Sequence, residues 1–176
     1  MAGLAGLGAA PAGALDFVYL VRHAEKADPW PKERDLDAFW PLSPAGAARA
    51  AALGARLEKA GISAVYTSRT TRTISTGMPL ATRARISIAA DDATIHTADM
   101  AGLLARLREI HAADAAVLIV GHSNTIPHLL VRLGAVPECY TRLGITDGPD
   151  GLLIDGYDGL WKVDLRRQGC DALARE

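Results

Sequence analysis

The chain has 176 residues, of which 49% are hydrophobic, and its formal net charge is -1. This size and composition are typical of one domain with a sizeable core. The balanced charge provides no basic surface for nucleic acid or an acidic membrane, aromatic residues make up only 5%, and no apolar run reaches the roughly 20 residues that span a bilayer. We therefore predict neither a nucleic-acid partner nor a membrane partner.

The first segment of the chain lacks the pattern of a folded element. Residues 1–15 are rich in Ala and Gly, and Ala12-Gly13-Ala14 is similar to a small-residue cleavage site. A basic start is absent and Gly interrupts the apolar part, so a disordered tail, a signal-peptide remnant and a start-site artefact all stay open. We expect one folded domain over 16–176.

Strands and helices are predicted to alternate along the rest of the chain. An apolar run predicts a buried strand over 17–21, and a long loop over 27–41 follows it. We expect Ser43 to cap a helix over 44–60 that ends at Gly61. Beyond it, the pattern predicts strands over 64–66, 85–88 and 115–120, helices over 70–82, 99–111 and 126–133, and a late hairpin of 152–154 with 160–164. This alternation favours an α/β fold, a three-layer α/β/α sandwich with a mostly parallel central sheet.

Chemically active side chains follow the apolar strands. Arg22 and His23 come directly after the first strand, and Gly121-His122-Ser123-Asn124 follows the strand over 115–120. Sites in open α/β sheets form outside the carboxyl ends of the strands, so these side chains are expected to meet there. A guanidinium offers a planar donor fork to an anion, an imidazole can act as a nucleophile, and a helix capped by Ser123 or Asn124 would present free amides. The pattern predicts a site for a phosphate-like ligand.

Three segments together resemble the histidine phosphatase (phosphoglycerate mutase-like) superfamily, in its short phosphatase branch. They are Val21-Arg22-His23-Ala24-Glu25-Lys26, then Ser68, Arg72 and Thr76 at four-residue steps, and then Val120-Gly121-His122-Ser123-Asn124-Thr125-Ile126-Pro127. Leu42-Ser43-Pro44-Ala45-Gly46 is also similar to the family's helix start, and Tyr157-Asp158-Gly159-Leu160-Trp161 to its late strand. The resemblance spans roughly 16–165 and implies a phosphoglycerate mutase-like fold.

The resemblance also implies a chemistry. His23 would attack phosphorus and form a phosphohistidine, Arg22 and Arg72 would hold the phosphoryl oxygens, and His122 would stabilise the transition state. A backbone carbonyl could fix the His23 tautomer, and neighbouring cations would lower the histidine pKa values.

Further members of the site are expected from their positions. Ser123 and Glu25 are additional candidates for substrate binding, although Glu25 and Lys26 could also form a solvated pair. We expect Ser68 to act as a helix cap, with a hydroxyl of the pocket as the alternative. No cofactor is implied, and no metal site is expected because a third ligand is missing and the arginines would repel a cation. The expected partner is a small phosphorylated substrate or a phosphoprotein.

The sequence departs from the family pattern at the general acid. Residues 81–99 contain no Glu; Asp91 and Asp92 are typical of an exposed turn, and Asp99 of a helix cap. No proton donor can be assigned, which favours substrates with good leaving groups, such as phosphoramidates. A phosphoglycerate mutase-type transferase, which would need that Glu and a longer insertion, and a catalytically silent phosphate-binding module are the alternatives.

Other features carry weaker expectations. Trp30, Phe39 and Trp40 are expected to anchor the long loop to the core, with a substrate-pocket wall as the alternative. Cys139 and Cys170 are expected to be separate thiols, and a disulfide stays open if the compartment oxidises. We favour export to the periplasm over a cytoplasmic location, because similar family members are often exported. The sequence leaves the oligomeric state open.

Overall fold

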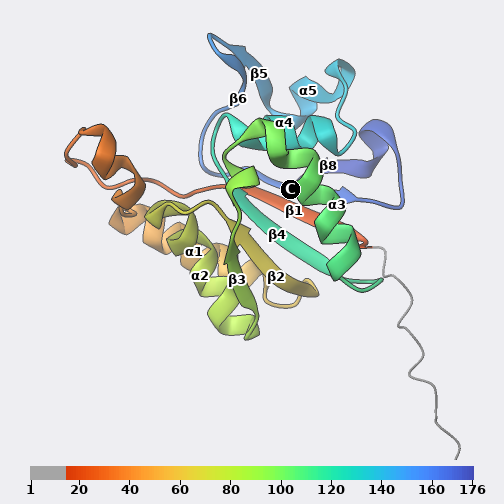
Figure 1. Ribbon diagram of the computed structural model, residues 1–176, viewed down its shortest axis with the longest axis horizontal. Coiled ribbons are helices and arrows are strands. Elements are labelled where there is room, and N and C mark those ends of the chain that lie inside the picture. The colour runs from red at the N-terminus through yellow and green to blue at the C-terminus, as the bar shows by residue number, and fades with distance from the viewer. Residues whose placement is uncertain (1–14) are drawn as a thin grey trace, which may run out of the picture.

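The computed structural model describes residues 15–176, apart from the side chains of residues 34 and 35, and has a central sheet of six strands in the order β3-β2-β4-β1-β7-β8 (Figure 1). These strands are β1 (Phe17–Arg22), β2 (Ile62–Thr67), β3 (Ser87–Ala90), β4 (Ala116–Gly121), β7 (Leu160–Asp164) and β8 (Leu173–Arg175). Neighbours from β3 to β1 pair in parallel, and β7 is antiparallel to both β1 and β8. A separate antiparallel pair consists of β5 (Ile145–Gly148) and β6 (Gly151–Ile154).

Helices cover both faces of the sheet (Figure 1). Residues of α1 (Pro44–Leu57) and α2 (Thr71–Ala84) pack on one face, with Tyr19 and Val21 of β1. Residues of α3 (Met100–Ile110) and α4 (Thr125–Arg132) pack on the other, with Val18 and Leu20. The six residues of β4 are all buried because this central strand has helices on both sides. The predicted α/β/α sandwich with a mostly parallel sheet is confirmed.

Smaller elements complete the domain. A fifth helix, α5 (Pro137–Leu143), lies beside β5, and the 3-10 helices are η1 (Arg34–Phe39), η2 (Asp92–Thr94), η3 (Thr97–Asp99) and η4 (Gly169–Ala172). None of the helices within 15–176 combines the length and the apolar composition that a membrane span requires. Leu15, which the sequence pattern assigns to the N-terminal tail, is buried in the core, and the rest of that segment lies outside the described residues.

The start of α1 holds the chain that follows β1. As predicted, the Ser43 hydroxyl accepts a hydrogen bond from the Gly46 N–H at 3.0 Å. A Cβ atom at position 46 would collide with the Glu25 carbonyl oxygen, which itself accepts from the Ser43 N–H at 2.9 Å. The glycine therefore lets the helix approach the backbone just beyond His23, which is how the motif at 42–46 supports the strand-end loop.

Two expectations about local structure are wrong. The late hairpin does not form, because β6 pairs with β5 while β7 crosses to the main sheet and pairs with β1. Trp161 and Val163 are buried and lie in register with Leu20 and Val18, so pairing with β1 adds both side chains to the core. Neither Asn124 nor Asp99 makes a side-chain capping bond, whereas Asp91 caps η2 through the Ala93 N–H at 2.9 Å.

The expectation of two separate thiols is also wrong. Cys139 of α5 and Cys170 of η4 form a disulfide, and their Cα atoms are 5.7 Å apart. The residues lie 31 positions apart in the sequence, so their spacing gave no local signal of the pairing. The bond ties the segment beyond β7 to the α5 side of the domain.

Reduction of this disulfide should lower the stability of the fold while leaving the residues that follow β1 and β4 in place. For a loop of 31 residues, chain entropy predicts a loss of about 3 to 4 kcal/mol in the free energy of unfolding. Urea unfolding with and without a reductant measures the loss, and a Cys139→Ala/Cys170→Ala variant serves as the control that reductant should not affect. An unfolding midpoint that reductant leaves unchanged would contradict the pairing.

Candidate active site

The carboxyl ends of β1 and β4 bring two histidines together. The strands are adjacent and parallel, with Arg22 in register with Gly121, and the His23 N–H donates to the Gly121 carbonyl oxygen at 2.9 Å. The residues after these strands therefore emerge side by side, and the ring centroids of His23 and His122 are 5.3 Å apart. The structure thus places both predicted histidines in one buried cluster.

The ring of His23 is held in one tautomer. Its Nδ1 lies 2.8 Å from the Ala24 carbonyl oxygen, which can only accept, so Nδ1 carries the proton. The other ring nitrogen, Nε2, then has a free electron pair. Only 4% of the residue is exposed, which limits competition from water. This is the arrangement that a nucleophilic imidazole requires.

The surroundings keep both imidazoles neutral. Burial, followed by the positive charges of Arg72, Arg22 and Lys26, lowers the pKa of His23 to about 4, although the bond to the Ala24 carbonyl opposes this shift. Burial and the proximity of His23 and Arg72 lower the pKa of His122 to about 3. The cations act in the predicted direction, but burial is the larger cause. At neutral pH, the His23 ring is therefore uncharged and its Nε2 carries no proton.

These pKa values predict that the fold loses stability in acid. The pKa of His23 falls from 6.5 to about 4 on folding, so the unfolded chain binds an additional proton between these values. The stabilisation is complete above pH 6.5 and declines as the pH falls toward 4. At about pH 5 the loss from His23 alone is about 2 kcal/mol.

Urea unfolding at neutral and acidic pH tests this expectation. The free energy of unfolding should fall less steeply with acidification in a His23→Gln variant than in the wild type, because glutamine does not titrate. A His96→Gln variant, which changes an exposed histidine, should keep the wild-type slope. Equal slopes for the His23→Gln variant and the wild type would contradict the buried neutral state of His23.

A cluster of hydroxyl groups orients His122. Its Nε2 lies 3.0 Å from the Ser68 Oγ, which in turn lies 3.1 Å from the Thr70 Oγ1 and 2.9 Å from the Thr73 Oγ1. The His122 N–H donates to the Thr125 Oγ1 at 2.9 Å. Ser68 is therefore a buried partner of the second histidine, and its expected role as a helix cap is wrong. The hydroxyl-rich sequence after β2 was the signal of this cluster.

Two arginines supply positive charge beside the rings. Arg22 donates to the Gly156 carbonyl oxygen at 2.9 Å, and its guanidinium carbon lies 4.2 Å from the centre of the Tyr157 ring. Arg72, on the first turn of α2, donates to the Asp37 carbonyl oxygen at 2.6 Å and to its carboxylate at 2.9 Å. In both arginines the Nε is buried without a hydrogen-bond partner among the described residues. Such donors are suited to the oxygens of an anion.

The two additional binding candidates have other contacts. Glu25 accepts three bonds of 2.7 to 3.0 Å from Arg49, and this contact lowers the pKa of its carboxyl group. Ser123 follows His122, and its carbonyl oxygen accepts from the Ile154 N–H at 2.9 Å. These bonds fix β6 and α1 near the strand ends. Substrate contact by Glu25 or Ser123 stays a prediction.

Not all of the aromatic residues in the loop over 27–41 hold it in place. The Trp40 indole N–H donates to the Ala27 carbonyl oxygen, and the Lys26 ammonium lies 3.6 Å from the centre of the Trp40 ring. Phe39 is 62% exposed, so the expectation that it anchors the loop is wrong. Sequence inspection missed the contact of Asp37 with Arg72, because no local pattern marks it.

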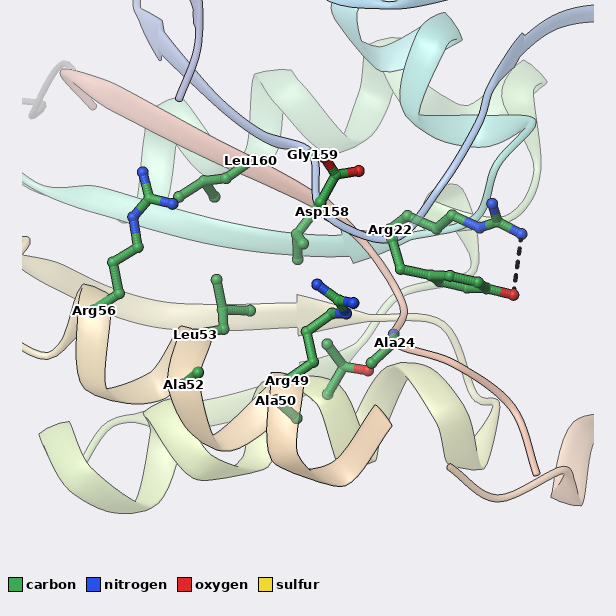
Figure 2. Close-up of a pocket in the computed structure, with 13 residues that line it drawn as sticks. Arg22, Ala24, Arg49, Ala50, Ala52, Leu53, Arg56, Asp158, Gly159 and Leu160 are labelled. Carbon is green, nitrogen blue, oxygen red and sulfur yellow. Dashed lines mark hydrogen bonds between the residues drawn. The ribbon is translucent and has the colours of Figure 1, made fainter. Parts of the chain in front are cut away.

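A pocket of about 170 Å³ lies next to the site, between α1 and the segment before β7. Figure 2 shows Arg49 and Arg56 rising from α1 on either side of Leu53, with Asp158 and Leu160 opposite them and Arg22 at one end. The lining is mainly apolar between these charged groups. Within 15–176, the structure contains no group of three His, Cys, Asp or Glu side chains that could hold a metal ion.

Comparison with known proteins finds a family match over part of the chain. Residues 18–96, which include Arg22, His23 and Arg72, match the sequence model of the histidine phosphatase superfamily (branch 1). None of the curated proteins matches the sequence at a significant level.

Solved structures match over most of the chain. SixA from Agrobacterium tumefaciens, a proposed phosphohistidine phosphatase, is 23% identical with a TM-score of 0.64, covering 85% of this chain and 92% of its own. A mycobacterial glucosyl-3-phosphoglycerate phosphatase is 16% identical with a TM-score of 0.60 and coverage of 92% and 97%. The protein histidine phosphatase SixA in its tungstate complex is 15% identical with a TM-score of 0.58 and coverage of 91% and 94%.

Because these sequence identities are low, the solved structures show only that the fold is shared. The match over residues 18–96 is a match of sequence. The resemblance seen in the strand-end motifs agrees with both. Over residues 18–96 the sequence is similar to the histidine phosphatase superfamily, and over most of its length the fold is similar to that of the solved phosphatases.

Proposed function

We propose that the protein is a phosphatase that hydrolyses phosphomonoesters or phosphoramidates through a phosphohistidine intermediate on His23, without a metal ion. The observation that carries the proposal is the bond between the His23 Nδ1 and the Ala24 carbonyl oxygen at 2.8 Å. It leaves Nε2 unprotonated within a cluster that contains Arg22, Arg72 and His122. The superfamily match and the phosphatases among the structural neighbours support the activity.

The charges around His23 suit a phosphoryl group. Phosphoryl transfer depends mainly on positioning and on stabilising charge that spreads over the equatorial oxygens. The buried Nε donors of Arg22 and Arg72 can each bind such an oxygen. The two guanidiniums also supply the positive charge that a metal ion provides in other phosphatases, and this supports a mechanism that needs no metal.

The proposed reaction has two displacements. The electron pair of the His23 Nε2 forms the bond to phosphorus while the bond to the leaving group breaks. Water then attacks the phosphohistidine, and the pair of the phosphorus–nitrogen bond returns to Nε2. Through both steps His122, oriented by Ser68 at 3.0 Å, lies beside the reacting centre and can stabilise the phosphoryl group.

Hydrolysis of p-nitrophenyl phosphate in the presence of EDTA tests the proposal. We expect activity that EDTA does not reduce. Activity that requires an added divalent metal would contradict the metal-free mechanism. No activity on this ester or on phosphohistidine peptides, together with binding of phosphate, would favour a silent phosphate-binding module, and transfer that depends on a bisphosphoglycerate primer would favour a mutase.

A further inference from the structure

The structure supplies a candidate for the proton donor that the sequence did not reveal. Asp37, on η1, bonds to Arg72 through both its carbonyl oxygen and its carboxylate, at 2.6 and 2.9 Å. The Arg72 side chain is 8% exposed and the Asp37 side chain 51% exposed. Asp37 therefore lies at the solvent side of a buried phosphoryl-binding cation. Its segment extends beyond the sheet before α1 begins (Figure 1).

Other acidic side chains near the strand ends have partners of their own. Glu25 is bonded to Arg49, Asp91 to Arg106 at 2.6 Å, and Asp92 to Arg69 at 3.0 Å. Asp91 and Asp92 follow α2 in the sequence, and their carboxylates are held in these ion pairs. The contact of Asp37 differs, because its partner is itself a residue of the candidate site.

The position of Asp37 fits the direction in which a leaving group departs. In an in-line displacement the leaving group lies opposite the attacking nitrogen, and His23 is almost fully buried. A leaving group that points toward solvent would lie on the side of Arg72 where Asp37 is exposed. The charged groups that influence this region are Arg72, Lys26 and His122, the last when protonated.

Substrate binding would bring a phosphoryl group next to the Asp37 carboxyl group. The carboxylate bonds to a terminal nitrogen of Arg72, whereas the Arg72 Nε has no partner among the described residues, so a phosphoryl oxygen on Nε would share this guanidinium with Asp37. A carboxyl group in this position is within reach of the leaving oxygen and can exchange a proton with it.

Resting on the phosphatase function proposed above, we propose that Asp37 is the general acid that protonates the leaving group. As the His23 Nε2 bonds to phosphorus, the electron pair of the breaking bond goes to the leaving oxygen, which takes the Asp37 proton. In the second step water attacks phosphorus and gives its proton to the Asp37 carboxylate. The sum is phosphate ester plus water to alcohol plus inorganic phosphate, with His23 and Asp37 restored.

The test compares two substrates that differ in their need for a proton. Asp37→Asn should lower kcat for an alkyl phosphate, such as glycerol phosphate, by roughly 100-fold, the lower range for a general acid. For p-nitrophenyl phosphate the loss should be small, because p-nitrophenolate leaves without a proton. Asp92→Asn, which removes an exposed carboxylate bonded to Arg69, is the matched control. Asp37→Glu should restore part of the alkyl phosphate activity.

The outcomes separate this inference from the function on which it rests. A selective loss on the alkyl phosphate supports Asp37 as the acid. Equal losses on both substrates, or equal gains from removal of a group that competes for Arg72, overturn it while leaving the phosphatase function intact. A wild-type protein without activity on either ester or on phosphohistidine peptides overturns both.

Discussion

Replacing His23 with alanine should reduce phosphatase activity by at least about 1,000-fold, since the variant lacks the group that we propose to form the covalent intermediate. The residue bonds to the Ala24 carbonyl oxygen through Nδ1, and burial, followed by the positive charges of Arg72 and Arg22, lowers its pKa. Alanine removes the proposed nucleophile but leaves both arginines. The loss should therefore appear in kcat, measured on p-nitrophenyl phosphate, while the affinity for inorganic phosphate changes much less.

A second histidine variant controls for general effects of substitution. His96 is exposed and lies outside the cluster, so His96→Ala should keep activity within about two-fold of the wild type, as is usual for surface changes. Circular dichroism and thermal melts show whether each variant is folded. A folded His23→Ala variant with substantial activity would rule out the phosphohistidine mechanism.

Arg72→Ala should have the second largest effect, a loss of about 100- to 1,000-fold in kcat/KM, the range seen when one donor to a transition-state oxygen is removed. Its guanidinium is buried beside both histidines, and the Nε donor has no partner among the described residues. The variant also loses affinity for the phosphoryl group, so KM should rise as well. Arg72→Lys should recover only part of the loss, because an ammonium group lacks the planar fork.

Arg69 provides the matched comparison for Arg72. It lies three residues earlier, is exposed and pairs with Asp92 at 3.0 Å. Arg69→Ala should therefore change kcat/KM by no more than about two-fold. Competitive inhibition by tungstate gives a measure of anion binding that does not depend on turnover. Equal effects of the two alanine variants on both measurements would contradict the assignment of Arg72 to the phosphoryl site.

Much of the fold was predictable because the signals were local. An apolar run that ends abruptly in Arg22-His23 predicted β1 and its strand-end chemistry, and the same pattern predicted β4 with His122. Ser43 and Gly46 marked the start of α1 through a cap and a close backbone approach. These elements depend on sequence neighbours and on periodicity, which a single sequence records.

The features that the sequence did not predict depend on contacts between distant segments. The disulfide joins two cysteines whose spacing carries no signal, and β7 pairs with β1 instead of with its neighbour in sequence. Asp37 reaches Arg72 from a loop without periodicity, across 35 positions. In the sequence, Ser68 is one of several hydroxyl residues after β2, and nothing there marks it as a partner of His122. The contact forms because β2 and β4 are neighbours in the sheet.

The central claim is a covalent phosphate on His23, and trapping that intermediate tests it most directly. The protein is mixed with ³²P-labelled substrate in the presence of EDTA, quenched rapidly in alkali, and digested for peptide mapping. We expect an acid-labile, alkali-stable label on the peptide that contains His23, and no label in His23→Ala. A catalytically active protein that gives no labelled peptide, or a label on His122 instead, would contradict the mechanism.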